Sequence, residues 1–291
     1  MLNALYPGDA LRLLQRSFRI GSDAFSHFNA ADGWAIASHI ALSTLMALFP
    51  FLIVVTALAG FLGSKELADQ AAQILLDAWP KVVSGPIALE VHSVLTTARG
   101  DVLTVGVALA VYFASSGIES LRIGLNRAYK ASEARPWWLL RLESIAYVLI
   151  SAAALLALAF LVILAPLIFA KTARYMPWLD PFSWSATFTR YGVASSVLIV
   201  ALVLVHLWLP AGRRSLLDIA PGIVATLVLW LAGGAMFGRY LAEFAVTYVT
   251  MYAGLASAMI ALVFLYVTAS IFIYGGELNA AIWRAREQEP E

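Results

Sequence analysis

The sequence predicts an all-α protein that crosses a membrane several times, and three observations support this fold class. Hydrophobic residues make up 62% of the 291 residues and charged residues 13%, whereas soluble domains are about 45–50% apolar and about 25% charged. The mean hydropathy is +0.83. Six long stretches contain no Asp, Glu, Lys or Arg, and each is close to the roughly 20 residues that one helical crossing needs. This composition excludes an ordinary soluble enzyme and a disordered or fibrous protein.

The six uncharged stretches give the expected transmembrane helices, which form a single domain over residues 35–282. They lie at residues 35–62, 102–118, 144–170, 191–212, 219–238 and 244–276. The second stretch is short, so its helix is expected to continue beyond Ile118. The last is long, and we expect one helix with a bent entry rather than two short helices.

The distribution of positive charge predicts the orientation of the chain. If the N-terminus is cytoplasmic, the cytoplasmic segments hold twelve of the 19 Lys and Arg residues, as the positive-inside rule requires. Both termini are therefore expected in the cytoplasm. Residues 1–34 are expected to form a cytoplasmic segment with an amphipathic helix, and residues 283–291 a cytoplasmic tail.

The loop between the first two spans, residues 63–101, is predicted to form an extracytoplasmic, amphipathic helical hairpin. Leu67, Ile74 and Leu75 recur at helical spacing on one face, and Pro80 ends this first helix. A second helix is expected to begin near Pro86. Two roles remain open for the hairpin: a cap packed on the bundle, or a lid over the mouth of a cavity.

Polar residues near the cytoplasmic ends of the spans are the main functional candidates, because polar groups are costly at membrane depth. They are Glu119, Arg122, Asn126, Arg213, Asp218, Glu277 and Asn279. Arginines and carboxylates alternate in this region, which favours a paired network. Glu119 and Arg122 are three residues apart and can pair within one helix. The network either gates a cavity or only holds the helices together.

Two intramembrane histidines and several helix-packing residues complete the candidates. His39 and His206 could serve a proton-coupled transporter, or could simply bond a hydroxyl or backbone carbonyl on a neighbouring helix. Pro50 lies midway along the first span, where it is either a hinge or a fixed bend. Gly234 and Gly238 form a GxxxG pattern, which favours close packing within the chain.

The sequence contains no recognisable catalytic constellation. Cysteine is absent and the four histidines, at 27, 39, 92 and 206, lack metal-ligand spacing. No phosphate-binding or nucleophile motif occurs. We therefore expect no enzyme activity and no catalytic, metal-binding or cofactor-binding residues. The net charge of +1 gives no support to nucleic-acid binding.

Six short segments together resemble the YihY/BrkB family of membrane proteins. They are residues 47–50 (ALFP), 115–118 (SSGI), 125–129 (LNRAY), 221–222 (PG), 252–256 (YAGLA) and 276–280 (GELNA). They occur in the family's order and span roughly residues 30–282. Two departures are visible: Leu42 and Ser43 stand where the family often has tyrosines, and Ala253 stands where many members have glycine.

The resemblance implies a six-helix protein of the bacterial inner membrane with cytoplasmic termini. Our leading functional hypothesis is a transporter that handles a lipid or amphipathic solute, with membrane lipids and that solute as its partners. The alternatives are a carrier or channel for a small ion or osmolyte, and a non-transporting scaffold that binds another envelope protein. Some family members carry an old ribonuclease label, which the residues do not support. The oligomeric state is left open.

Overall fold

The computed structural model describes residues 7–61, 100–154, 183–252 and 255–287. In chain order its helices are α1 (Pro7–Ala30), α2 (Gly33–Phe61), α5 (Gly100–Ala128), an unlabelled helix at Trp137–Ala154, α7 (Ser183–Trp208), α8 (Leu216–Tyr252) and α9 (Ala256–Glu287). The described part of the chain is thus helical with short connections, which confirms the predicted all-α class. Residues 63–99 of the predicted hairpin lie outside the described residues.

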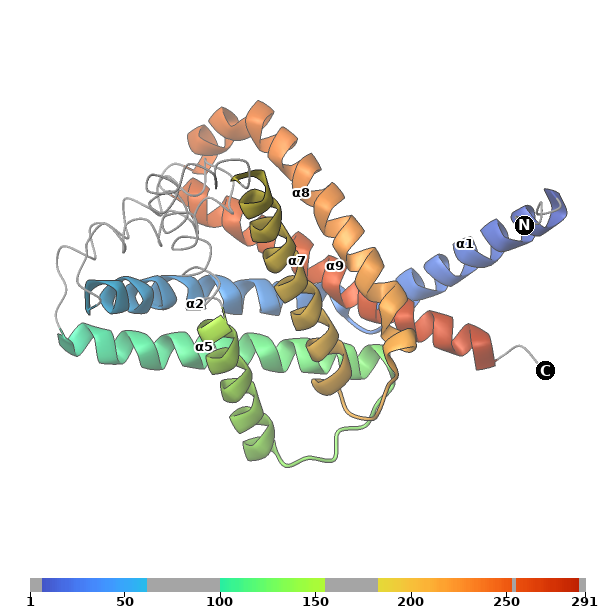
Figure 1. Cartoon of the computed structure of the whole chain (residues 1–291), viewed down its shortest axis with the longest axis horizontal. Helices are drawn as coiled ribbons and strands as arrows, with labels where there is room; N and C mark the ends of the chain where they lie inside the picture. Colours follow the sequence, from blue (N-terminus) through green and yellow to red (C-terminus); the bar gives the residue numbers. More distant parts are fainter. Residues whose placement is uncertain (1–6, 62–99, 155–182, 253–254, 288–291) are drawn as a thin grey trace.

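Two antiparallel helix pairs build the molecule, with α9 at its centre (Figure 1). In the first pair α2 lies beside α5, where the imidazole Nδ1 of His39 is 2.5 Å from the hydroxyl of Ser120. In the second pair α8 lies beside α9, where the Trp230 indole donates to the Thr268 carbonyl at 2.9 Å. Helix α9 contacts α1, α2, α5 and α8, and its Ile273 belongs to the main apolar core.

Four helical stretches are long and apolar enough to span a bilayer. They are Thr104–Ala128, Trp137–Ala154, Leu216–Phe244 and Ala258–Glu287. Two shorter apolar stretches, Gly33–Leu48 and Ser195–Trp208, accompany them. Many apolar side chains on these helices face outward, such as Leu231 at 77% exposure. Such an outer surface is suited to lipid rather than to water.

The observed helix ends can be compared with the ends of the predicted spans. Helix α5 continues to Ala128, which confirms the expected extension beyond Ile118, and α2 is close to its expected span. Helix α7 begins earlier than predicted and ends at Trp208 rather than 212, because Pro210 cannot continue it. Residues 155–170 of the third stretch lie outside the described residues.

The boundary between the last two stretches was predicted in the wrong place. Helix α8 runs through Arg239 and Glu243 to Tyr252, so residues 244–252 belong to it and α9 begins only at Ala256. Charged side chains that extend away from the bundle do not interrupt a helix backbone, and this is why charge alone marked the boundary poorly. Residues 283–287, expected in the tail, are also helical.

Two local motifs define the loops that later form the pocket. Helix α5 ends in a Schellman motif: the Ala131 amide donates to the Asn126 carbonyl at 2.9 Å, and the Lys130 amide to the Arg127 carbonyl at 3.1 Å. Lys130 accordingly has a positive φ of 51°. Helix α8 begins with a capping box, in which the amide of Ser215 donates to the Asp218 carboxylate at 3.1 Å.

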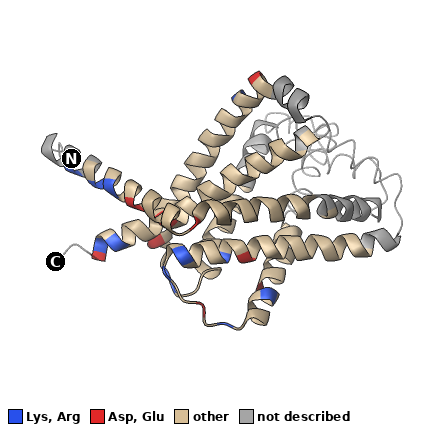
Figure 2. Ribbon diagram, turned by 180° about the vertical axis from the view of Figure 1, so that it is seen from behind, with Lys and Arg blue, Asp and Glu red and all other residues tan. Residues whose placement is uncertain are grey.

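Charged side chains gather at one end of the bundle. Figure 2 shows most Lys, Arg, Asp and Glu residues of the described segments near the end from which α1 and the end of α9 project. The long helical stretches away from this end are almost uncharged. We call this region the charged end.

Candidate functional site

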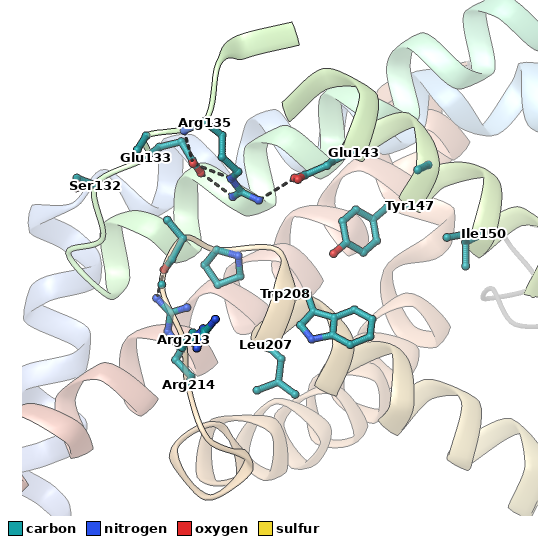
Figure 3. Close-up of a pocket in the computed structure, with 15 residues that line it drawn as sticks. Ser132, Glu133, Arg135, Glu143, Tyr147, Ile150, Leu207, Trp208, Arg213 and Arg214 are labelled. Carbon is teal, nitrogen blue, oxygen red and sulfur yellow. Dashed lines mark hydrogen bonds and ion pairs between the residues drawn. The ribbon is translucent and has the colours of Figure 1, made fainter. Parts of the chain in front are cut away.

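The charged end contains a pocket of about 1000 Å³. Three parts of the chain surround it: the loop of residues 131–136, the helix Trp137–Ala154, and the end of α7 with the loop of residues 209–215 that follows it (Figure 3). One end of the pocket carries charged side chains and the other carries apolar side chains.

Arg135 organises the first charged wall. Its guanidinium donates to both carboxylate oxygens of Glu133 and to Glu143, all at 2.8 Å, and to the Leu209 carbonyl at 3.3 Å. Glu143 also accepts from Arg122 at 3.4 Å, and the side chain of Arg122 is only 3% exposed. Two carboxylates and two guanidiniums thus neutralise one another in this wall, as charges in a low-dielectric setting must.

Asn126, at the end of α5, joins the two loops that border the pocket. Its amide nitrogen donates to Glu133 at 3.2 Å, and its amide oxygen accepts from the backbone N–H of Ala211 at 2.7 Å. Asn126 is buried at 9% exposure. The side chain singled out by sequence therefore has a clear structural role, since it holds the loop of residues 131–136 against the loop of residues 209–215.

Arg213 and Arg214 form the second charged wall. The Arg214 guanidinium lies 3.9 Å above the ring of Tyr129 and donates to the Ala211 carbonyl at 2.8 Å. Its Nη1 is buried without a hydrogen-bond partner among the described residues. Burial lowers the pKa of Arg214 from its usual value, which reflects incomplete solvation of the charge. Arg213 is exposed.

The opposite end of the pocket is apolar. It is lined by Tyr147 and Ile150 of the helix Trp137–Ala154 and by Leu207 and Trp208 of α7 (Figure 3). Trp208 is 64% exposed, which is unusual for a large indole in water and common at a membrane interface. Sequence reasoning did not select these residues, because an aromatic residue at the end of an apolar helix is not distinctive until its neighbours are known.

Asn279 connects the pocket to the helix pair α8–α9. Its amide oxygen accepts from the Gly222 backbone N–H at 2.6 Å, and its amide nitrogen donates to the Tyr129 hydroxyl at 3.3 Å. Tyr129 in turn lies under Arg214. Asn279, a candidate from the sequence, therefore positions Tyr129, and Tyr129 in turn contacts Arg214 of the pocket.

Glu119 and Arg122 pair with residues of the helix Trp137–Ala154. Glu119 does not pair with Arg122, as their spacing suggested, but with Arg141 of the next helix at 2.7 Å. Arg122 extends instead toward Glu143. Two separate salt bridges thus join α5 to the helix Trp137–Ala154.

Glu277 and Asp218 attach α9 to other helices at the charged end. Glu277 is 1% exposed and lies 2.8 Å from Nδ1 of His27 on α1. Asp218 caps α8 and lies 3.5 Å from Arg286 at the end of α9. Neither residue lines the pocket.

The two candidate histidines have local partners. His39 is close to Ser120, as described above, and Nδ1 of His206 lies 2.9 Å from the Leu202 carbonyl in its own helix. The His206 ring also packs on Phe272 of α9, with ring centroids 4.9 Å apart. Pro50 lies inside α2, which is continuous to Phe61. A hinge at Pro50 therefore remains a prediction.

The pairing of Glu133 predicts a pH dependence of stability. Hydrogen bonds from Arg135 hold the pKa of Glu133 at about 2, below the usual value near 4.5. Because the folded state lowers this pKa, the stabilisation is complete above about pH 4.5 and is lost as the pH falls toward 2. We expect the melting temperature of the wild type to fall more steeply over this range than that of Glu133→Gln. Glu287→Gln, which removes an exposed carboxylate, is the control and should follow the wild type; parallel curves for all three proteins would contradict the assignment.

Metal-binding geometry is not found in the described segments. No group of three or more His, Cys, Asp or Glu side chains lies close enough together there to hold a metal ion. The polar chemistry of the pocket is instead that of guanidinium, carboxylate and amide groups.

The apolar helices and the charged end together define a class: an all-helical membrane protein with several apolar helices. Comparison with known sequences identifies the family. The chain belongs to the virulence factor BrkB family, whose pattern matches residues 24–291. The resemblance inferred from six short segments is thereby confirmed.

Two curated proteins resemble the chain over most of its length. One is the "Putative ribonuclease-like protein YfkH" of Bacillus subtilis (strain 168), 25% identical over 271 residues, which are 92% of this chain and 97% of that protein. The other is the "UPF0761 membrane protein RC1_0578" of Rhodospirillum centenum (strain ATCC 51521 / SW), 28% identical over 262 residues, which are 87% of this chain and 55% of that protein. No solved structure matches.

Proposed function

We propose that this protein is a transporter that moves a lipid or another amphipathic solute across the bacterial inner membrane. The observation that carries the proposal is the pocket at the charged end, in which arginines and the apolar residues Tyr147, Ile150 and Trp208 share one cavity. A solute with a polar head and an apolar tail has a complementary surface for each end of this pocket. The apolar end of the pocket offers no favourable contact to a small hydrated ion.

The topology proposed with this function has six membrane spans and cytoplasmic termini. Four long and two shorter apolar helical stretches support the number of spans. The projection of α1 and the end of α9 from the same end of the bundle supports an even number of crossings (Figure 1). The excess of Lys and Arg in the segments at this end supports its cytoplasmic location.

We also propose that the protein acts without enzymatic chemistry. The carboxylates of the pocket are paired with arginines, so neither Glu133 nor Glu143 is free to act as a general base. The ribonuclease-like name belongs to the Bacillus relative. Purified protein that cleaves RNA after contaminating nucleases have been excluded would overturn this part of the proposal.

The transport proposal can be tested with reconstituted protein. In liposomes with fluorescently labelled phosphatidylglycerol in both leaflets, a membrane-impermeant quencher added outside should bleach the inner-leaflet label faster when the protein is present. Equal bleaching rates in liposomes with and without protein would contradict transport.

A pair of tryptophan substitutions relates transport to the pocket. Ala146→Trp places a large side chain on the pocket wall and should bring the bleaching rate close to the protein-free rate. Leu231→Trp is the control, because Leu231 lies on α8 away from the pocket and is 77% exposed. Equal bleaching rates for the two variants would contradict a role of this pocket in transport.

A further inference from the structure

The charges around the pocket do not cancel, and the excess is positive. Glu133 and Glu143 are already engaged by Arg122 and Arg135 in the first wall. Arg213 and Arg214 on the second wall have no carboxylate partner within the described segments. Two guanidinium groups thus face a shared cavity without anions to balance them (Figure 3).

The Arg214 guanidinium is held in position while its Nη1 nitrogen has no partner among the described residues. The ring of Tyr129 and the carbonyl of Ala211 orient the guanidinium. The Nη1 nitrogen is buried. Arg214 lines the pocket and has no carboxylate partner among the described residues, so an anionic group in the pocket would be attracted to its charge. Since a guanidinium presents its donors in a planar fork, a phosphate or carboxylate group is the matching acceptor.

The apolar wall restricts the ligand further. Leu207 and Trp208 lie at the end of α7, just before the loop that carries Arg213 and Arg214. Tyr147 and Ile150 line the same pocket from the helix Trp137–Ala154. A fully hydrophilic anion would leave these surfaces in contact with water. An acyl chain attached to the anionic group would cover them.

We propose that the pocket binds an anionic amphiphile, with Arg213 and Arg214 on its phosphate or carboxylate group and with Tyr147 and Trp208 beside its acyl chain. The inference rests on the proposed function in one respect: it names the class of solute that the transporter would take. The selectivity for anionic over zwitterionic heads comes from Arg213 and Arg214, which are therefore specificity-determining residues.

Brominated lipids provide a direct measurement, because bromine quenches tryptophan fluorescence only at short range. The full chain is placed in nanodiscs of phosphatidylcholine with a minor fraction of either brominated phosphatidylglycerol or brominated phosphatidylcholine. Trp208→Phe removes the part of the quenching that comes from Trp208. Trp230→Phe, which changes a residue in the α8–α9 contact, is the control and should leave that part in place. We expect this contribution to report about a tenfold preference for the anionic lipid, as two unpaired arginines near a headgroup suggest.

The arginine variants test the source of the preference. Arg213→Gln changes an exposed residue and should weaken the preference without affecting the fold, and Arg213→Gln with Arg214→Gln should abolish it. The matched control is Arg12→Gln with Arg19→Gln, which removes the same charge from exposed positions on α1 and should leave the preference intact. If this control removes the preference equally, general attraction to an anionic surface explains it and the proposal is overturned.

Two further outcomes separate the sources of the anion. If inorganic phosphate displaces the brominated lipid at concentrations near those of the lipid, the pocket is a site for a free anion and the proposal is overturned. If phosphate fails to displace the lipid while lysophosphatidic acid succeeds, the proposal is supported. Nanodiscs measure binding without transport, so a protein that shows the preference but moves no lipid would retain this inference and lose the proposed function.

Discussion

Gly222→Ala should lower the stability of the protein more than any surface substitution. A Cβ atom at this position would collide with the backbone carbonyl of Gly275 and with the side chain of Asn279 on α9. A backbone carbonyl cannot move aside cheaply, so α8 and α9 would have to separate along their contact. We expect a loss of about 3 kcal/mol or more, and a fall in Tm on the order of 10 °C in detergent.

The reciprocal substitution and a matched control complete this prediction. Gly275→Ala should be equally damaging, since its Cβ would meet Thr226 Oγ1 and, at 2.9 Å, the Gly222 carbonyl. Gly234 and Gly238 lie on the same helix as Gly222, yet a Cβ at either position meets none of the described residues within 4 Å. Gly234→Ala and Gly238→Ala should therefore be neutral. The GxxxG pattern therefore does not mark the close contact within the chain that we predicted from it. A neutral Gly222→Ala would contradict the α8–α9 geometry.

Glu143→Gln should cause the second large loss of stability, because it removes the carboxylate that Arg122 and Arg135 share. Arg135 retains Glu133. Among the described residues, buried Arg122 keeps only its hydrogen bond to the Leu140 carbonyl at 3.1 Å. Breaking one side of a buried ion pair costs about 3–5 kcal/mol. We expect a value near the lower limit, since Glu143 itself is 31% exposed. Thermal unfolding followed by size-exclusion chromatography measures the change.

Two comparisons keep the Glu143 prediction testable. Glu119→Gln removes a pair whose members are 24% and 31% exposed, so its cost should be smaller, at about 1 kcal/mol or less. Arg122→Met combined with Glu143→Gln should recover part of the loss, because it no longer leaves a buried charge unpaired. If the double variant is as unstable as the sum of its single variants, the two side chains do not act as a pair.

The helical class was predictable because each crossing of a bilayer requires a long apolar helix. Apolar stretches of sufficient length are visible in composition alone, and α2 and α5 follow from them with little error. Helix ends were predicted less well where a charged residue lies on an outward face. Arg239 and Glu243 were interpreted as the boundary between two spans, although α8 continues past both. A charge at the edge of the bilayer affects solvation and leaves the backbone hydrogen bonds intact.

The site was predictable only in part, because its pairs join residues that are distant in sequence. Spacing suggested that Glu119 pairs with Arg122, but in the structure each is bonded to the helix Trp137–Ala154. Asn126 and Asn279 were chosen as members of a candidate polar cluster. In the structure both are buried, and each forms a hydrogen bond to a residue at or next to the pocket. Glu133 and Trp208 could not be chosen, since their importance depends on which loops and helices meet at the charged end.

The bridging amide of Asn126 also has a consequence for size selection. Two side chains join the loops beside the pocket. The Asn126 carboxamide bonds Glu133 of one loop and Ala211 of the other, and the Arg135 guanidinium donates to the Leu209 carbonyl across the same gap. The separation of the loops at this point is therefore limited to the reach of these two side chains. For the ligand proposed above, a headgroup that needs a wider opening would first have to break these hydrogen bonds, so we expect the pocket to select by bulk as well as by charge.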